Sequence, residues 1–112
     1  MNRTVISALA GCAALFGAAF AQECALEAEA PKMPNAKTAT AEERAATIAA
    51  IKDYQAALGE YRTCLDTISG NEELEVDVRQ EALDDYNDSV EKETKLVEAW
   101  QKFSKAYDKA NK

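Results

Sequence analysis

"TAEERAATIAAIKDYQAALGEYRTCLDTI", residues 40–68, is the stretch that decides the fold. Thr40 and Glu43 form a capping box, in which each side chain accepts a hydrogen bond from the other residue's backbone amide. Residues 69–71, Ser-Gly-Asn, then supply a helix stop. We therefore predict a helix over about residues 41–68. Its apolar side chains recur every three or four residues and form one narrow stripe, made of Ile51, Tyr54, Leu58, Tyr61, Leu65 and Ile68.

A second amphipathic segment is predicted to form a helix over about residues 76–109, with Asp77 and Gln80 as a candidate second capping box. The expected stripe of this helix is Val76, Leu83, Tyr86, Val90, Val97, Trp100 and Tyr107, with Phe103 alongside.

The two stripes match when the chain is folded antiparallel about residue 72. This register pairs Ile68 with Val76, Tyr61 with Leu83, Leu58 with Tyr86, and Tyr54 with Val90. The turn that it requires, residues 69–75, has an ordinary length for a connection between helices. We therefore predict an all-α fold, in which residues 41–110 form an antiparallel two-helix hairpin of coiled-coil type.

The first 21 residues have the features of a signal peptide. Arg3 gives a positive start, residues 4–20 carry no charge, and the small-residue pattern at residues 19–21 predicts cleavage after Ala21. The protein is then expected in the periplasm or outside the cell, with no membrane span. Two alternatives stay open. The first is a retained membrane helix, although the uncharged run of residues 4–20 is short for a span and rich in alanine. The second is a lipid anchor on Cys12, which ends the lipobox-like residues 9–12, LAGC.

Residues 22–40 form the next segment, which contains both prolines of the chain, Pro31 and Pro34. Proline fixes φ and lacks an amide donor, so we predict an extended leg with no helix or strand. In polyproline geometry the leg from Cys24 to Thr40 would span about 50 Å. That length exceeds the rise of about 35 Å from Ala41 to the cysteine at position 64 in the first helix.

Cysteine usage predicts one crosslink. Cys12 is either removed with the leader or acylated, which leaves Cys24 and Cys64. In an oxidising compartment an even pair of cysteines indicates a disulfide, which would tie the leg to the first helix.

The chain also resembles a group of short exported proteins of proteobacteria. The likeness covers most of residues 24–107 and is carried by a cysteine followed by APKMPNA, then TATAEE, DYQAALGEYRTCL, DDYNDSV and AWQKFSKAY. The resemblance implies a helical hairpin tied to an N-terminal leg by a disulfide, and it brings no catalytic residues.

Composition limits the chemistry that the protein can perform. The 112 residues carry 13 basic and 20 acidic side chains and no histidine. Phosphate binding requires clustered lysine and arginine, so we expect no nucleic-acid partner. Without histidine no ordinary nucleophile and base pair can form, and we expect a protein that is not an enzyme and has no cofactor and no metal site.

Two clusters of side chains are candidate binding sites. Acidic residues crowd positions 72–91, including Asp84, Asp85 and Asp88, and six lysines follow between residues 92 and 112. Acidic residues near the start of a helix and basic residues near its end complement the helix dipole. The alternative is weak binding of a divalent cation, but this stretch lacks the glycine that a calcium-binding loop requires. Three aromatic residues at helical spacing are expected to belong to the core, with a partner-binding patch as the alternative; they are Trp100, Phe103 and Tyr107.

These observations lead to two functional hypotheses. The first is a non-enzymatic exported protein with a structural or interaction role in the cell envelope. The second is a small periplasmic chaperone or an inhibitor of a cell-wall enzyme. Under both hypotheses we expect the protein to contact another protein or to self-associate, because two helices rarely bury all of their large apolar side chains.

Overall fold

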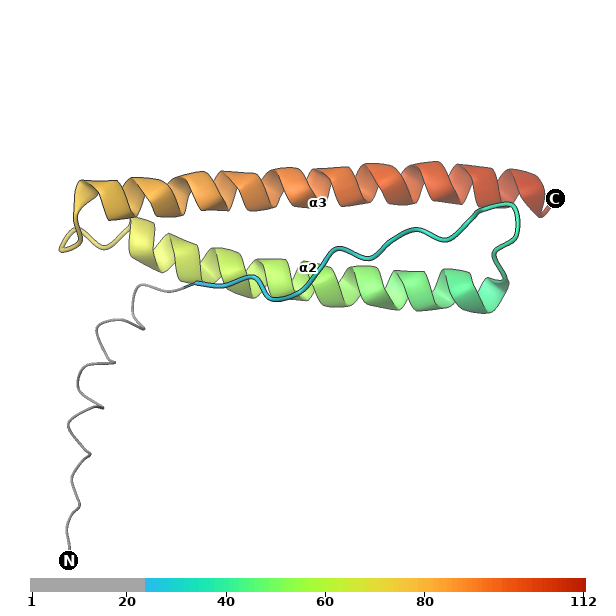
Figure 1. Ribbon diagram of the computed structural model, residues 1–112, viewed down its shortest axis with the longest axis horizontal. Helices are drawn as coiled ribbons and strands as arrows, with labels where there is room; N and C mark the ends of the chain where they lie inside the picture. Colours follow the sequence, from blue (N-terminus) through green and yellow to red (C-terminus); the bar gives the residue numbers. More distant parts are fainter. Residues whose placement is uncertain (1–23) are drawn as a thin grey trace, which may run out of the picture.

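A computed structural model describes residues 24–112, which form helices α2 (Ala41–Ser69) and α3 (Val76–Ala110). The helices lie antiparallel and side by side, and residues 24–40 form an extended leg that runs along them (Figure 1). The predicted hairpin and leg are thereby confirmed. The predicted helix bounds differ from these by one residue at each C-terminal end. The signal peptide assigned to residues 1–21 and the lipidation considered for Cys12 lie outside the described residues.

Helix α2 begins as its capping box predicts. The backbone amide of Glu43 donates to Thr40 Oγ1 over 3.0 Å, and the amide of Thr40 donates to Glu43 Oε1 over 2.8 Å. A turn centred on Asn35 precedes it: Asn35 Oδ1 accepts from the amide of Lys37, and its carbonyl accepts from the amide of Ala39. This turn reverses the chain from the leg into α2.

The N-terminus of α3 differs from the prediction. Its N-cap residue is Glu75, whose side chain makes no capping hydrogen bond. The candidate box of Asp77 and Gln80 is therefore wrong. Asp77 already lies in the first helical turn, where it cannot act as N-cap, and the side-chain amide of Gln80 instead donates to Asp84 Oδ1 over 3.2 Å.

The register of the two helices also differs from the prediction. The buried line of α3 consists of residues seven apart, Ala82, Ser89, Leu96 and Phe103. Leu58 clusters with Tyr54 and Leu96, and Leu65 and Ile68 cluster with Ala82. The pairs predicted by folding about residue 72 are wrong for two reasons. Helix α3 is rotated by one position, or about 100°, so that Val76, Leu83 and Val90 do not face α2. The facing residues are also displaced along the axis, since Leu58 packs with Leu96 and Arg62 bonds to Ser89. The apolar residues that this rotation of α3 leaves exposed are Val76 (71%), Leu83 (44%), Val90 (43%) and Val97 (38%).

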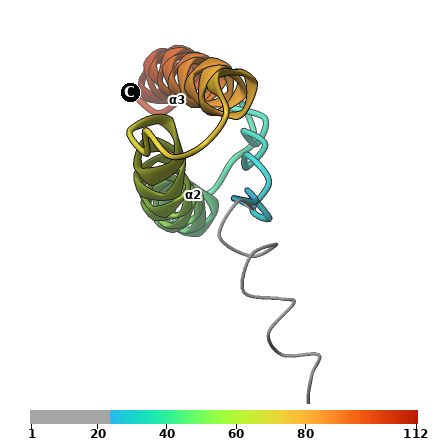
Figure 2. The same cartoon turned by 90° about the vertical axis from the view of Figure 1, so that its left-hand side faces the viewer.

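The leg explains why the small residues of α3 face inward. Its partly buried side chains Leu26, Ala28 and Met33 pack against the Tyr54, Leu58 and Leu96 cluster. The view along the helices shows the leg on one side of the pair (Figure 2). The leg thus supplies apolar bulk that two helices alone would have to provide. Ala82 and Ser89 are small and buried, so they allow the two helices to approach each other closely.

Gly59 offers a direct test of the helix interior. It is exposed within α2, and a Cβ atom at this position would meet no atom within 4 Å. We expect Gly59→Ala to raise the free energy of unfolding by about 1 kcal/mol, the difference in helix propensity. Urea unfolding of the disulfide-bonded protein measures the change. Gly70→Ala is the control that should bring no such gain, because its Cβ would lie 3.3 Å from the carbonyl oxygen of Asp66 at the helix end. A loss of stability in Gly59→Ala would contradict this description of α2.

Candidate functional site

The predicted disulfide joins the beginning of the leg to α2. Cys24 and Cys64 are bonded, with Cα atoms 5.8 Å apart and a separation of 40 in sequence. Cys24 also packs against the cluster of Leu65, Ile68 and Ala82. The disulfide therefore fixes one end of the leg, and the turn at Asn35 fixes the other.

The three aromatic residues of α3 lie at the end of the hairpin where α2 begins. Phe103 is buried, with 5% of its surface exposed, and its ring centroid lies 5.4 Å from Trp100 and 5.7 Å from Tyr107. The Arg44 guanidinium lies 5.4 Å from the Trp100 ring centroid and 5.5 Å from that of Tyr107. These cation–π contacts tie the two helices together. Phe103 belongs to the core, while Trp100 and Tyr107 are half-buried beside it.

The acidic residues 84, 85 and 88 lie on α3, and two of them act on a tyrosine of α2. Burial raises the pKa of Tyr61 above 10.0, and the negative charges of Asp85 and Asp88 raise it further. Among residues 24–112 no group of three or more histidine, cysteine or acidic side chains is arranged to hold a metal ion.

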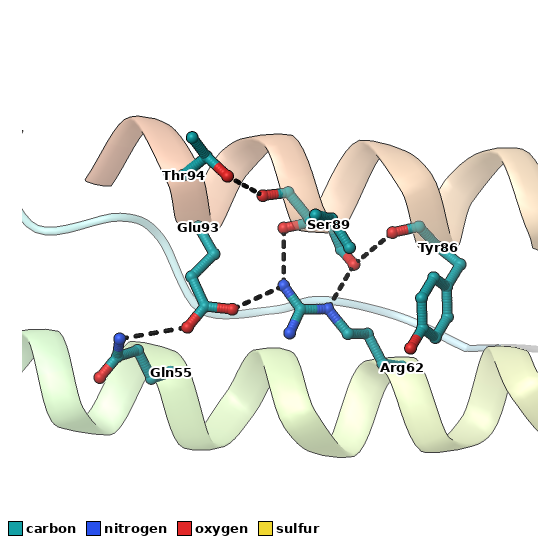
Figure 3. A network of polar contacts seen from close by, with 7 residues as sticks. Gln55, Arg62, Tyr86, Ser89, Glu93 and Thr94 are labelled. Atoms are coloured by element: carbon teal, nitrogen blue, oxygen red, sulfur yellow. Dashed lines mark hydrogen bonds and ion pairs between the residues drawn. The ribbon is translucent and has the colours of Figure 1, made fainter. Parts of the chain in front are cut away.

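A polar network crosses the helix pair midway along its length (Figure 3). Arg62 of α2 donates from Nε to Ser89 Oγ over 2.8 Å and from Nη2 to the Ser89 carbonyl over 2.9 Å. Its Nη2 also forms an ion pair with Glu93 Oε1 at 2.8 Å, and Glu93 Oε2 accepts from Gln55 Nε2 at 3.1 Å. Ser89 Oγ in turn donates to the carbonyl of Tyr86. The network satisfies the buried serine and fixes how the helices align.

Removing the arginine tests this alignment. We expect Arg62→Ala to lower the free energy of unfolding by about 1 to 2 kcal/mol, less than for a fully buried pair because both partners are partly exposed. Their side chains expose 20% and 29% of their surface. The matched Glu93→Gln variant permits a double-mutant cycle by urea unfolding. Strictly additive losses would show that the two side chains do not interact in solution.

A second line of apolar residues faces outward on α3. We call Val76, Leu83, Val90 and Val97 the α3 outer stripe; they are seven residues apart and all exposed. Alongside the stripe runs a line of exposed polar residues without charge, Gln80, Asn87, Thr94 and Gln101. A groove of about 330 Å³ opens where Val90 and Val97 meet Arg62 of α2.

The α3 outer stripe and the leg lie on different sides of the hairpin. The leg meets α3 along Lys92, Lys95, Leu96 and Ala99, which line a hollow together with Leu26 and residues 28–31. The groove beside the stripe contains no residue of the leg and is lined by Arg62, Val90, Glu93, Thr94, Val97 and Glu98. Figure 2 shows that the described chain leaves this other side of the helix pair uncovered.

Charge differs between the two edges of the stripe. Its outer edge consists of exposed acidic residues at the same spacing, which we call the acidic edge: Asp77, Asp84, Glu91 and Glu98. Its inner edge consists of residues engaged with α2. Arg79 donates to the Ser69 carbonyl, Tyr86 packs on the Leu65 cluster, and Glu93 and Trp100 are held by the arginines described above.

The apolar pattern of the sequence does not indicate this surface, because it favours a core position for the same four residues. One signal could have indicated it: Ala82, Ser89, Leu96 and Phe103 repeat every seven residues, one position away from the stripe. The network around Arg62 was also missed, since a single arginine in an apolar face gives no pattern of its own.

Comparisons with known proteins give no assignment. No family model, no curated protein and no solved structure matches the chain. Within residues 24–112, neither helix has the length and hydropathy needed to span a bilayer.

Proposed function

We propose that the protein is a non-enzymatic interaction protein of the bacterial envelope, exported with loss of residues 1–21, and that it binds another protein through the α3 outer stripe. The observation that carries the proposal is this row of exposed apolar side chains, Val76 to Val97, on a side of the hairpin that the leg does not cover. Apolar residues aligned on one exposed face of a helix at a spacing of seven are a pattern that a partner helix can cover.

The disulfide supports an oxidising compartment. Disulfides persist in secreted and periplasmic proteins and are rare in the reducing cytosol. The Cys24–Cys64 bond connects the described leg with α2, and the segment before it has the charge and hydropathy of a signal peptide.

A binding role agrees with the chemistry of the side chains. The sequence contains no histidine, and Cys24 and Cys64 are joined to each other. A cysteine sulfur in a disulfide is not a nucleophile. A serine or threonine hydroxyl would need a base to activate it as a nucleophile.

Photocrosslinking in the native host tests the proposal. A photoreactive amino acid in place of Val90 is expected to give a discrete crosslinked species in the periplasmic fraction. The same amino acid in place of Glu60, exposed on α2, is the control and should give none. Recovery of the protein in the cytosol, or equal crosslinking from both positions, would contradict the proposal.

The alternative role as a chaperone or an inhibitor would use the same exposed apolar residues. A chaperone should suppress the aggregation of a denatured client protein, and its crosslinks should form a broad smear in place of one species. An inhibitor should reduce the activity of a cell-wall hydrolase such as lysozyme when the two are mixed, and salt should weaken the effect if acidic groups carry the contact.

A further inference from the structure

We infer that the α3 outer stripe binds a basic amphipathic helix, with the apolar side chains of the partner on the stripe and its lysines or arginines over the acidic edge. The inference rests on the proposed function and adds to it the chemistry of the partner.

The shape of the surface selects a rod-like partner. The four apolar residues from Val76 to Val97 are aligned along one helix and span about 32 Å at the rise of an α-helix. Their spacing of seven residues is the repeat at which two helices stay in contact along a seam. The groove where Val90 and Val97 meet Arg62 provides a recess between α2 and α3 for one of the partner's side chains.

The charge of the surface selects a basic partner. All four residues of the acidic edge are exposed, and they follow the stripe over its whole length. On the inner edge, Arg79 and the arginine at position 62 bind groups within the hairpin. A partner helix lying on the stripe therefore meets a row of exposed carboxylates along one flank, of which Glu91 and Glu98 lie four residues before Lys95 and Lys102 on the same helix. Lysine or arginine at the flanking positions of the partner would pair with them.

A second copy of this chain fits the surface less well. The full chain carries a net charge of −7, loss of residues 1–21 removes one basic residue, and each copy has the same acidic edge. Antiparallel pairing of two stripes would oppose acidic edge to acidic edge, and would set each apolar residue against an uncharged polar one such as Asn87 or Thr94. Parallel pairing would alternate apolar layers with polar ones and bring Glu98 towards Glu93. Both arrangements leave half of the seam polar, and the like charges oppose association.

Three synthetic peptides of about 21 residues test the inference on the full disulfide-bonded protein. The first has leucine at the seam positions of an amphipathic helix and lysine elsewhere. The second is a scrambled sequence of the same composition, and the third replaces lysine with glutamate. Fluorescence anisotropy should detect binding of the first peptide alone, and binding should weaken as salt is raised.

Variants of the stripe locate the contact. Val90→Asn with Val97→Asn should weaken binding of the lysine peptide at least tenfold, because two apolar contacts are lost. Ala49→Asn with Ala56→Asn, also seven residues apart but on α2, is the matched control and should change binding less than about twofold. Both alanines are exposed, and circular dichroism of each variant checks that the helices are intact.

A second pair of variants distinguishes the effect of the acidic edge on peptide binding from the effect of the net charge of the protein. Asp84→Asn, Glu91→Gln and Glu98→Gln together should weaken binding about tenfold and reduce its salt dependence. The control removes the same three charges at exposed positions away from the stripe, with Asp53→Asn, Glu60→Gln and Glu29→Gln. This control should keep most of the affinity.

Several results would overturn the inference. They are equal binding of the scrambled or the glutamate peptide, equal effects of the stripe variants and their controls, and absence of binding by all three peptides. A dimer in sedimentation that Val90→Asn and Val97→Asn abolish would identify a second copy as the occupant. Discrete crosslinks from position 90 together with any of these results would leave the proposed function standing and remove only the basic helix as its partner.

Discussion

Replacing Cys64 with serine is expected to lower the free energy of unfolding by about 4 kcal/mol and the melting temperature by roughly 20 °C. The Cys24–Cys64 bond closes a loop of 40 positions, so its loss restores a large conformational entropy to the unfolded chain. It also releases one end of a leg whose residues 26, 28 and 33 pack on the core. Thermal melts followed by circular dichroism measure the effect.

Two further samples show whether the crosslink itself is responsible. Cys24→Ser, and the natural protein treated with a reducing agent, should both lose as much stability as Cys64→Ser. The double variant should lose no more than either single one, because each change removes the same bond. An unchanged melting temperature in Cys64→Ser would contradict the role given to the leg and its disulfide.

Truncating the centre of the core is the other large change. Leu58 exposes 0% of its surface and packs with Tyr54 and Leu96. We expect Leu58→Ala to lower the free energy of unfolding by about 3 kcal/mol, within the range for leucines whose removal leaves a cavity. Urea unfolding at constant temperature measures the loss.

Leu83→Ala is the matched control, and it also tests the register of the helices. Leu83 exposes 44% of its surface, so its truncation should cost less than about 1 kcal/mol, offset in part by the helix propensity of alanine. The sequence pattern placed Leu83 in the core opposite Tyr61. Equal losses in the two variants would favour that register over the one observed.

Local signals in the sequence predicted the elements of the fold well. The capping box at Thr40 and Glu43 and the stop after Ile68 locate α2 to within a residue, because hydrogen bonds between near neighbours determine these ends. The disulfide between Cys24 and Cys64 followed from the number of cysteines left after the leader. The extended leg followed from its prolines.

The face of α3 could not be predicted in the same way. Two parallel lines, one through Leu83 and one through Ala82, both repeat every seven residues, and the first is the more apolar. Pairing two helices in isolation favours the apolar line. The leg changes this balance, since it covers one side of the pair and brings its own apolar side chains to the Leu58 cluster. A contact between distant segments thus overrides the local pattern.

The candidate site depends on the same rotation. Once Ala82 and Ser89 face inward, Val90 and Val97 must face outward, and Arg62 can reach both Ser89 and Glu93. Neither the network nor the outer stripe can be deduced from spacing alone, because both require the register of α2 against α3. Of the three aromatic residues that were considered as a binding patch, Phe103 is buried, and Trp100 and Tyr107 contact Arg44.

The intact mass of the protein isolated from its host, alkylated without reduction, tests both the export of the chain and the disulfide that fixes the leg. We predict a single species that begins at Gln22 and carries no alkyl group, because Cys24 and Cys64 are joined in the exported chain. A mass that includes residues 1–21, or one with both of these cysteines alkylated, would contradict the export and the tethered leg together.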